Sequence, residues 1–193
     1  MKIQQYLVIF FLTLISCNSD KISKKSVEFN NKAINAIQEE KYSEALNYAD
    51  AAIKEDSNNY NAYTIKAQIL VKEDKLNEAE ETIQKQLEIK PDFAEGWTFK
   101  GIINDLNGNP LKAKSDYQKG INLFEERIKK DKSNKQANII NEYFNLILIG
   151  DEISKQKMTQ IENQYKNDKS VYDFLISYRG YSKEEIMKQI FSK

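Results

Sequence analysis

The strongest constraint on the fold is a sequence pattern that recurs every 34 residues. A large aromatic residue, a small residue and an alanine each keep their place in three successive copies. The three columns are Phe29, Tyr63 and Trp97; Ala33, Ala67 and Gly101; and Ala45, Ala79 and Ala113. Self-similarity at one fixed spacing predicts a row of like structural units, each stacked on its neighbours.

Each copy of the pattern predicts two helices joined by a short polar turn. In the second copy we expect helices over 60–72 and 77–89, with small residues on both so that the two backbones approach closely. Apolar residues at helical spacing give the second helix a face to bury. The 193 residues include only six Gly and two Pro, which favours helix throughout. We therefore expect an all-α solenoid of antiparallel helix pairs.

These columns resemble those of the tetratricopeptide repeat (TPR) family, whose first aromatic, small residue and most characteristic alanine they match. Ala52 and Gly120 match a further small position, whereas Gln86 departs from the pattern there. Pro91 matches the proline that ends a unit, and Ser57 replaces it in the first unit. An unrelated helical bundle is the alternative. The resemblance implies a TPR-type fold and says little about chemistry.

The resemblance covers residues 26–124 and divides them into three units, 26–59, 60–93 and 94–124. We expect the last helix of the third unit to run on to about Lys130. Residues 125–193 then hold the rest of that helix, a degenerate fourth helix pair and C-terminal capping helices. The expected helices of this region are 136–149, 153–165, 171–178 and one opened by a capping box at 182–185 and ending at Phe191.

The N-terminus predicts a targeting segment and a lipid anchor. Lys2 precedes an apolar run over residues 6–15, which is too short to span a bilayer and has the length found in secretory signals. Leu14, Ile15, Ser16 and Cys17 follow, and Cys17 is the only cysteine. This tetrad resembles the lipobox of bacterial lipoproteins, which implies removal of residues 1–16 and acylation, with palmitate as one of the chains, at Cys17. An ordinary signal peptide or a buried apolar helix is the alternative.

The residues after Cys17 predict a tether. Residues 17–25 are polar and without an apolar pattern, and they reach at most about 30 Å when extended. In lipoproteins of Gram-negative bacteria, Asp directly after the cysteine commonly retains the protein at the inner membrane. This chain has Asn18 instead. We expect a cell-envelope protein, lipid-anchored at the outer membrane and facing the periplasm.

The first helices of such arrays line a concave groove, which predicts the candidate binding residues. Their mixture of amides, hydroxyls and aliphatic groups suits a polypeptide ligand. By analogy with the family, the lining is Asn30, Ile34, Ile37, Asn61, Thr64, Gln68, Val71, Thr98, Ile102 and Asp105. The alternative is that several of these side chains face only water or their neighbours.

The residue types on the first helices exclude a groove that binds a C-terminal carboxylate. TPR co-chaperones hold a C-terminal carboxylate with Lys, Arg and Asn from successive first helices. The matching places here are filled by Asn30, Ile34, Ile65, Glu95 and Phe99. Lysine also recurs every 34 residues, but not at the carboxylate-binding places. We expect these lysines to form a solvated ridge: Lys32, Lys66 and Lys100.

The composition excludes several functional classes. With no histidine and one cysteine, the chain has neither a zinc site nor a Ser-His or Cys-His pair, and it has no Gly-rich phosphate loop. We expect no enzyme activity, no cofactor and no metal. The segment 105–110 is a weak match to a calcium loop, but Pro110 replaces a required glycine, so we interpret it as a turn. Equal numbers of basic and acidic residues (29 each) argue against nucleic-acid binding.

The leading functional hypothesis is a membrane-anchored adaptor that binds another envelope protein or peptide. The alternative is an accessory ligand-binding lipoprotein of an outer-membrane nutrient uptake system. The aromatic residues of the C-terminal tail predict packing onto the preceding helices, with a homodimer surface as the alternative.

Overall fold

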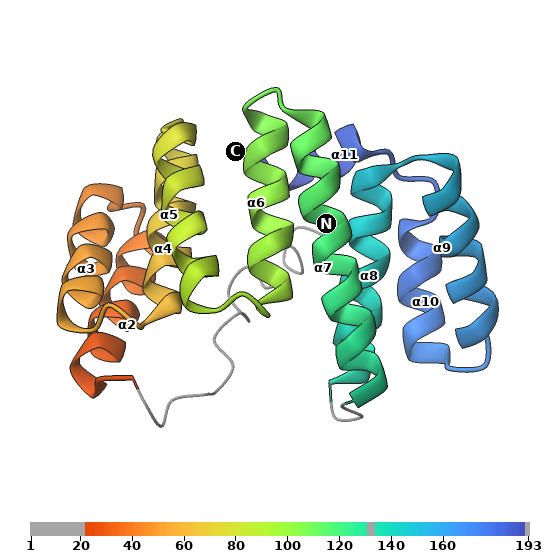
Figure 1. Ribbon diagram of the computed structural model, residues 1–193, viewed down its shortest axis with the longest axis horizontal. Coiled ribbons are helices and arrows are strands. Elements are labelled where there is room, and N and C mark those ends of the chain that lie inside the picture. Colours follow the sequence, from red (N-terminus) through yellow and green to blue (C-terminus); the bar gives the residue numbers. More distant parts are fainter. Residues whose placement is uncertain (1–21, 131–133, 192–193) are drawn as a thin grey trace. The chain divides into compact units, whose positions relative to one another are not determined.

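The computed structural model describes residues 22–130 and 134–191, and within these ranges the chain is helical and contains no strand. The all-α prediction is confirmed (Figure 1). The predicted signal peptide (1–16) and Cys17 lie outside the described residues, as does most of the predicted tether (17–25). The tether prediction is wrong at its end, because Lys24 and Lys25 already belong to the first described helix.

The chain forms two compact units, whose described parts are 22–113 and 114–191. In the N-terminal unit, successive helices pack against each other and the first also contacts the third, as in a solenoid of helix pairs. Its helices are α2 (Lys24–Gln38), α3 (Tyr42–Glu55), α4 (Tyr60–Lys72), α5 (Leu76–Ile89) and α6 (Ala94–Leu106). The bounds of α4 are those that the sequence predicts, and α5 begins one residue earlier.

The C-terminal unit is built around α8, which packs against α9, α10 and α11. Its helices are α7 (Pro110–Lys130, which begins in the N-terminal unit), α8 (Lys135–Ile149), α9 (Glu152–Tyr165), α10 (Lys169–Tyr178) and α11 (Lys183–Phe191). α8 is apolar over most of its circumference and is buried from Asn138 to Leu148 apart from two residues. Ser182 and Glu185 form the predicted capping box, with backbone-to-side-chain distances of 2.7 and 3.2 Å.

The small residues of the 34-residue pattern lie at the helix contacts. Ala33 and Ala45 are fully buried, and with Ala36, Ala49 and Ile65 they belong to one apolar cluster shared by α2, α3 and α4. Alanine at these contacts lets two helix backbones pack closely, which a larger side chain would prevent.

In the second and third units the aromatic residue of the repeat ties the first helix to the turn before it. The Tyr63 hydroxyl donates to the carbonyl of Ser57 at 3.3 Å, and the Trp97 indole N–H donates to the carbonyl of Pro91 at 2.9 Å. Both bonds link residues six positions apart. The repeated aromatic residue therefore fixes the angle at which the chain enters the helix.

Gln86, which departs from the repeat pattern, is matched by Gly96 on the next helix. Gln86 is fully buried and donates its amide to the carbonyl of Tyr60 at 3.3 Å and to the Thr64 hydroxyl. A Cβ on Gly96 would lie 2.5 Å from the Gln86 side-chain oxygen and 2.9 Å from Phe93. The larger side chain at 86 is thus accommodated by the absence of a side chain at 96.

A left-handed residue ends the first helix of every unit. Glu40, Asp74 and Gly108 stand 34 residues apart and have φ angles of 59°, 60° and 72°. In each case the next N–H bonds a carbonyl five residues back at 2.8 Å, as in a Schellman motif. Two of the three turns therefore hold a non-glycine residue in a conformation that costs an L-residue free energy.

Changing Glu40 or Asp74 to glycine is expected to raise the free energy of unfolding by about 0.5–1 kcal/mol each, because the relief of strain exceeds the added entropy of the unfolded chain. Urea denaturation measures the effect. Gly108→Ala, whose Cβ would meet no atom within 4 Å, serves as the reverse control and is expected to destabilise. A lower stability of both glycine variants would contradict the prediction.

Candidate peptide-binding surface

The ten predicted groove residues lie on α2, α4 and α6 and divide into two groups by exposure. Six are half-buried at the surface: Ile34, Ile37, Asn61, Gln68, Val71 and Asp105. Four are buried: Asn30, Thr64, Thr98 and Ile102. The second group belongs to the interior of the protein and does not present surface to a ligand.

The buried polar members of the prediction hold the helices together. Asn30 donates to the Asn59 side chain at 3.3 Å, and Asn59 donates to the Ser26 hydroxyl at 2.7 Å. The Ser26 hydroxyl in turn donates to the carbonyl of Ala52 at 2.7 Å. This chain of bonds joins α2 to the end of α3 and the start of α4. The Thr64 hydroxyl accepts from the Gln86 amide, which joins α4 to α5.

The half-buried members on α2 and α4 form a continuous candidate surface, because these two first helices contact each other. Ile34, Ile37 and Val71 supply aliphatic side chains, while Asn61 and Gln68 supply amides. The Gln68 amide nitrogen is buried and has no hydrogen-bond partner. A buried donor without a partner costs free energy that a ligand carbonyl would recover. We call these five residues the first-helix surface.

The recurring lysines do not form the solvated ridge that the sequence predicts. Lys32 is exposed, but Lys66 and Lys100 are half-buried. Lys66 reaches back to Asp50 at 2.7 Å, and Lys100 reaches Gln84 at 2.8 Å. Each bond runs from the first helix of one unit to the second helix of the unit before it, so the lysine column links successive units.

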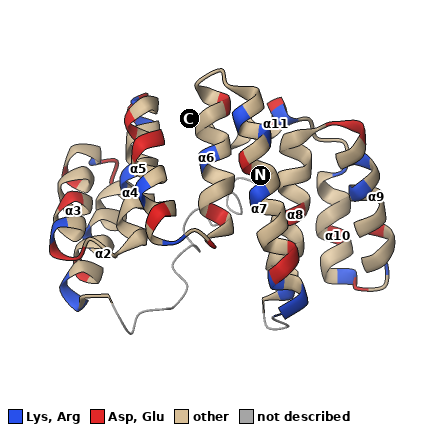
Figure 2. Cartoon of the chain, viewed as in Figure 1, with Lys and Arg blue, Asp and Glu red and all other residues tan. Residues whose placement is uncertain are grey.

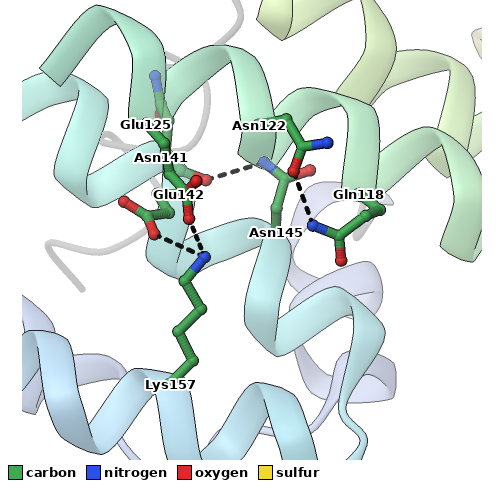
Figure 3. Close-up of polar contacts among 7 residues, drawn as sticks. All are labelled: Gln118, Asn122, Glu125, Asn141, Glu142, Asn145 and Lys157. Carbon is green, nitrogen blue, oxygen red and sulfur yellow. Dashed lines mark hydrogen bonds and ion pairs between the residues drawn. The ribbon is translucent and has the colours of Figure 1, made fainter. Parts of the chain in front are cut away.

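A buried ionic cluster joins three helices of the C-terminal unit. Lys157 of α9 lies between Glu125 of α7 and Glu142 of α8, and its ammonium is 3.2 Å from the Glu142 carboxylate (Figure 3). Glu142 is 6% exposed. Burial raises the pKa of the Glu142 carboxyl above its usual range, while Lys157 opposes that rise.

A second acid in this unit is held by two donors. The Tyr143 hydroxyl donates to Glu162 at 2.5 Å, and Arg179 pairs with the other oxygen of the same carboxylate. Burial pushes the pKa of Glu162 upward, but the bonds from Arg179 and Tyr143 outweigh it, so the pKa falls below its usual value. Burial and Glu162 together raise the pKa of Tyr143. Both acids are paired and hold helices in place.

A cleft of about 790 Å³ opens beside this second cluster. Ile149, Met158, Glu162, Arg179 and Tyr181 are among the residues that line it, from the end of α8, from α9 and from the turn between α10 and α11. Within the described ranges no group of three or more potential metal ligands comes together. None of the described helices is long and apolar enough to cross a bilayer.

Residues 36–103 match the family model of the tetratricopeptide repeat. Among solved structures, the chain is similar to the first TPR of Spaghetti (RPAP3) bound to the HSP90 peptide SRMEEVD, with 18% identity, a TM-score of 0.51 and coverage of 54% of this chain and 83% of that one. It is similar to the Sgt2 TPR domain from Aspergillus fumigatus, with 16% identity, a TM-score of 0.53 and coverage of 77% and 88%.

A third similar structure is the MamA RS-1 ArsTM double mutant, with 15% identity, a TM-score of 0.53 and coverage of 92% of this chain and 88% of that chain. Comparison with curated proteins gives no match. At these identities the structural similarity establishes the fold alone. The described residues therefore have the all-helical, helix-pair repeat fold of TPR-like solenoids.

Proposed function

We propose that this chain is a lipid-anchored adaptor of the bacterial cell envelope, without enzyme activity, that binds a polypeptide partner on the first-helix surface. The observation that carries the proposal is the unpaired Gln68 amide beside half-buried aliphatic side chains on two adjacent first helices. This combination suits an extended peptide, because one backbone carbonyl can accept from Gln68 while apolar side chains contact Ile34, Ile37 and Val71.

The anchor part of the proposal is supported by the sequence. An apolar run of signal length ends at the chain's single cysteine, Cys17, within a lipobox-like tetrad. Two or three acyl chains on that residue would hold the protein on a bilayer, since each buried CH₂ contributes about 0.8 kcal/mol. Asn18 supports the outer membrane, facing the periplasm.

Crosslinking pull-down from native membranes tests the binding surface. The variant Asn61→Arg/Gln68→Ala is expected to capture at least about tenfold less partner than the wild type, because the arginine side chain covers the surface and the Gln68 donor is removed. Asn47→Arg, a matched change on the exposed side of α3, is expected to retain it. Equal capture by both variants, at unchanged thermal midpoints, would overturn the binding proposal.

Metabolic labelling with a clickable palmitate tests the anchor separately. The wild-type chain is expected to incorporate the label and fractionate with membranes, and Cys17→Ser is expected to lose both properties. A wild-type chain that stays unlabelled would refute the anchor and leave the binding surface to be judged on its own test.

The cleft of the C-terminal unit favours the alternative function, an accessory ligand-binding lipoprotein of a nutrient uptake system. Its volume of about 790 Å³ falls within the roughly 300–1,000 Å³ of small-molecule sites. Calorimetric titration with a panel of glycans tests this role, and heat of binding that Tyr181→Ala abolishes would support it.

A further inference from the structure

One edge of the C-terminal unit gathers basic side chains, although the whole chain is neutral. At this edge α7 and α9 end and α8 and α10 begin. Among the described residues of 126–136 and 163–170, the only acids are Glu126 and Asp168. The basic residues, which we call the basic edge, are Arg127, Lys129, Lys130, Lys135, Lys166 and Lys169.

Contacts between the helix ends show that these residues share one edge. Gln136 at the start of α8 donates to Ser170 at the start of α10 at 3.3 Å. The Lys135 ammonium lies 5.4 Å from the ring centroid of Tyr165, the last residue of α9. Figure 2 shows basic segments at the lower ends of α7 and α10. Four of the six basic side chains are exposed, and the other two are half-buried.

The opposite edge of the same unit is balanced. At the turn between α8 and α9, Lys114 pairs with Asp151 at 2.8 Å and Lys155 pairs with Glu152 at 2.6 Å. Arg179, after α10, pairs with a buried acid. On the basic edge Lys130 pairs with Glu126 at 3.1 Å, and the remaining basic residues outnumber the acids there.

Helix stability explains only part of the basic edge. Lys129 and Lys130 lie in the last turn of α7, where cations interact favourably with the helix dipole. Lys135 and Lys169 are instead the first residues of α8 and α10, where the dipole disfavours a cation. Positive charge at these two helix starts costs stability, which the Tyr165 ring beside Lys135 and the N-cap Asp168 beside Lys169 offset in part. An anionic partner would offset more of this cost.

We propose that the basic edge rests on an anionic phospholipid surface. Five of its six cations are lysines, which act as point charges and suit a diffuse layer of headgroups better than one shaped anion. This inference rests on the proposed anchor, which would keep the whole chain at a bilayer, so a weak electrostatic contact is enough.

Sedimentation of the full chain with vesicles tests the inference. The readout is the ratio of binding between vesicles of phosphatidylcholine mixed with phosphatidylglycerol and vesicles of phosphatidylcholine alone. A lipid chain or apolar N-terminus adds equally to both, so the ratio isolates the charge contact. The wild-type chain is expected to prefer the anionic vesicles, and Lys130→Glu/Lys166→Glu/Lys169→Glu to lose that preference by about tenfold or more.

The matched control is Lys54→Glu/Lys72→Glu/Lys85→Glu, which changes net charge equally at exposed positions of α3, α4 and α5. It is expected to keep the preference, and added salt is expected to remove it from the wild type. Equal loss in both triple variants, each with an unchanged thermal midpoint, would overturn the proposal. So would tighter binding to single-stranded DNA or polyglutamate than to anionic vesicles. Palmitate labelling is independent of this ratio, so failure of the anchor and failure of the basic edge are distinguishable.

Discussion

Lys157→Met is expected to lower the free energy of unfolding by about 2–3 kcal/mol at neutral pH, because it leaves the buried Glu142 carboxylate without its partner. The value lies below the range for fully buried pairs because the Lys157 side chain is 30% exposed. Glu125 adds to the loss, since its negative charge then stands beside a second uncompensated acid (Figure 3).

The loss should depend on pH in a defined direction. The pKa of Glu142 is already raised by burial in the native protein, and removal of Lys157 raises it further. A group with a raised native pKa contributes stability that is present below its unfolded pKa and is lost as pH rises through the native pKa. The variant's deficit is therefore expected to be largest at neutral pH and to shrink in mildly acidic buffer as Glu142 takes up a proton.

Chemical denaturation at both pH values measures this difference. Lys155→Met is the control on the same helix, since its pair with Glu152 is exposed, and it is expected to cost at most about 1 kcal/mol. Adding Glu142→Gln to Lys157→Met should recover part of the loss at neutral pH. A deficit that is equal at both pH values would show that the lysine acts through packing and not through the charge of Glu142.

Gly96→Ala is expected to destabilise the N-terminal unit by about 1–3 kcal/mol, because the new methyl group overpacks the contact between α5 and α6. The Cβ would lie 2.5 Å from the Gln86 oxygen and 2.9 Å from a Phe93 carbon, both closer than real Cβ contacts. Gln86 has little room to retreat, since it is fully buried and held by Tyr60 and Thr64.

The additional change Gln86→Ala should rescue Gly96→Ala. One repeat earlier, the same two positions hold Ala52 and Ala62, both fully buried, so an alanine pair fits this contact. A double-mutant cycle by urea denaturation is expected to give a coupling of about 1–2 kcal/mol. Gln84→Ala, on the other side of α5, is the control and should give no rescue. If the losses in free energy of unfolding caused by Gly96→Ala and Gln86→Ala were additive, the proposed matching of the two residues would be wrong.

Most of the fold could be predicted from the sequence because its determinants are local. Helix α4 begins and ends where the pattern predicts, and α7 continues to Lys130 as expected. Polar turns and the capping box at Ser182 act through neighbours within a few positions in the chain. The 34-residue period then implies that successive helix pairs stack on each other.

The candidate surface was harder to predict, because the exposure of a side chain depends on residues far away in the sequence. Asn30 and Thr98 are polar like their half-buried neighbours, yet both are buried, as is Thr64 at the same place in the second copy. Asn30 bonds a side chain 29 residues away. The 34-residue period puts Asn30, Thr64 and Thr98 in a column apart from Asn61 and Gln68, but residue type alone does not show that this column is buried.

The sequence by itself determined the helical class, the repeat length and, to within one or two residues, the bounds of the helices for which it predicted ranges, since backbone hydrogen bonds and turn preferences act over three to five residues. Only the tertiary structure decided which side chains meet. The pairing of Lys157 with Glu125, of Gln86 with Gly96, and of Lys66 with Asp50 joins different helices. Such pairs depend on how the helices pack, and no period in the sequence specifies which polar side chain the packing brings to face another.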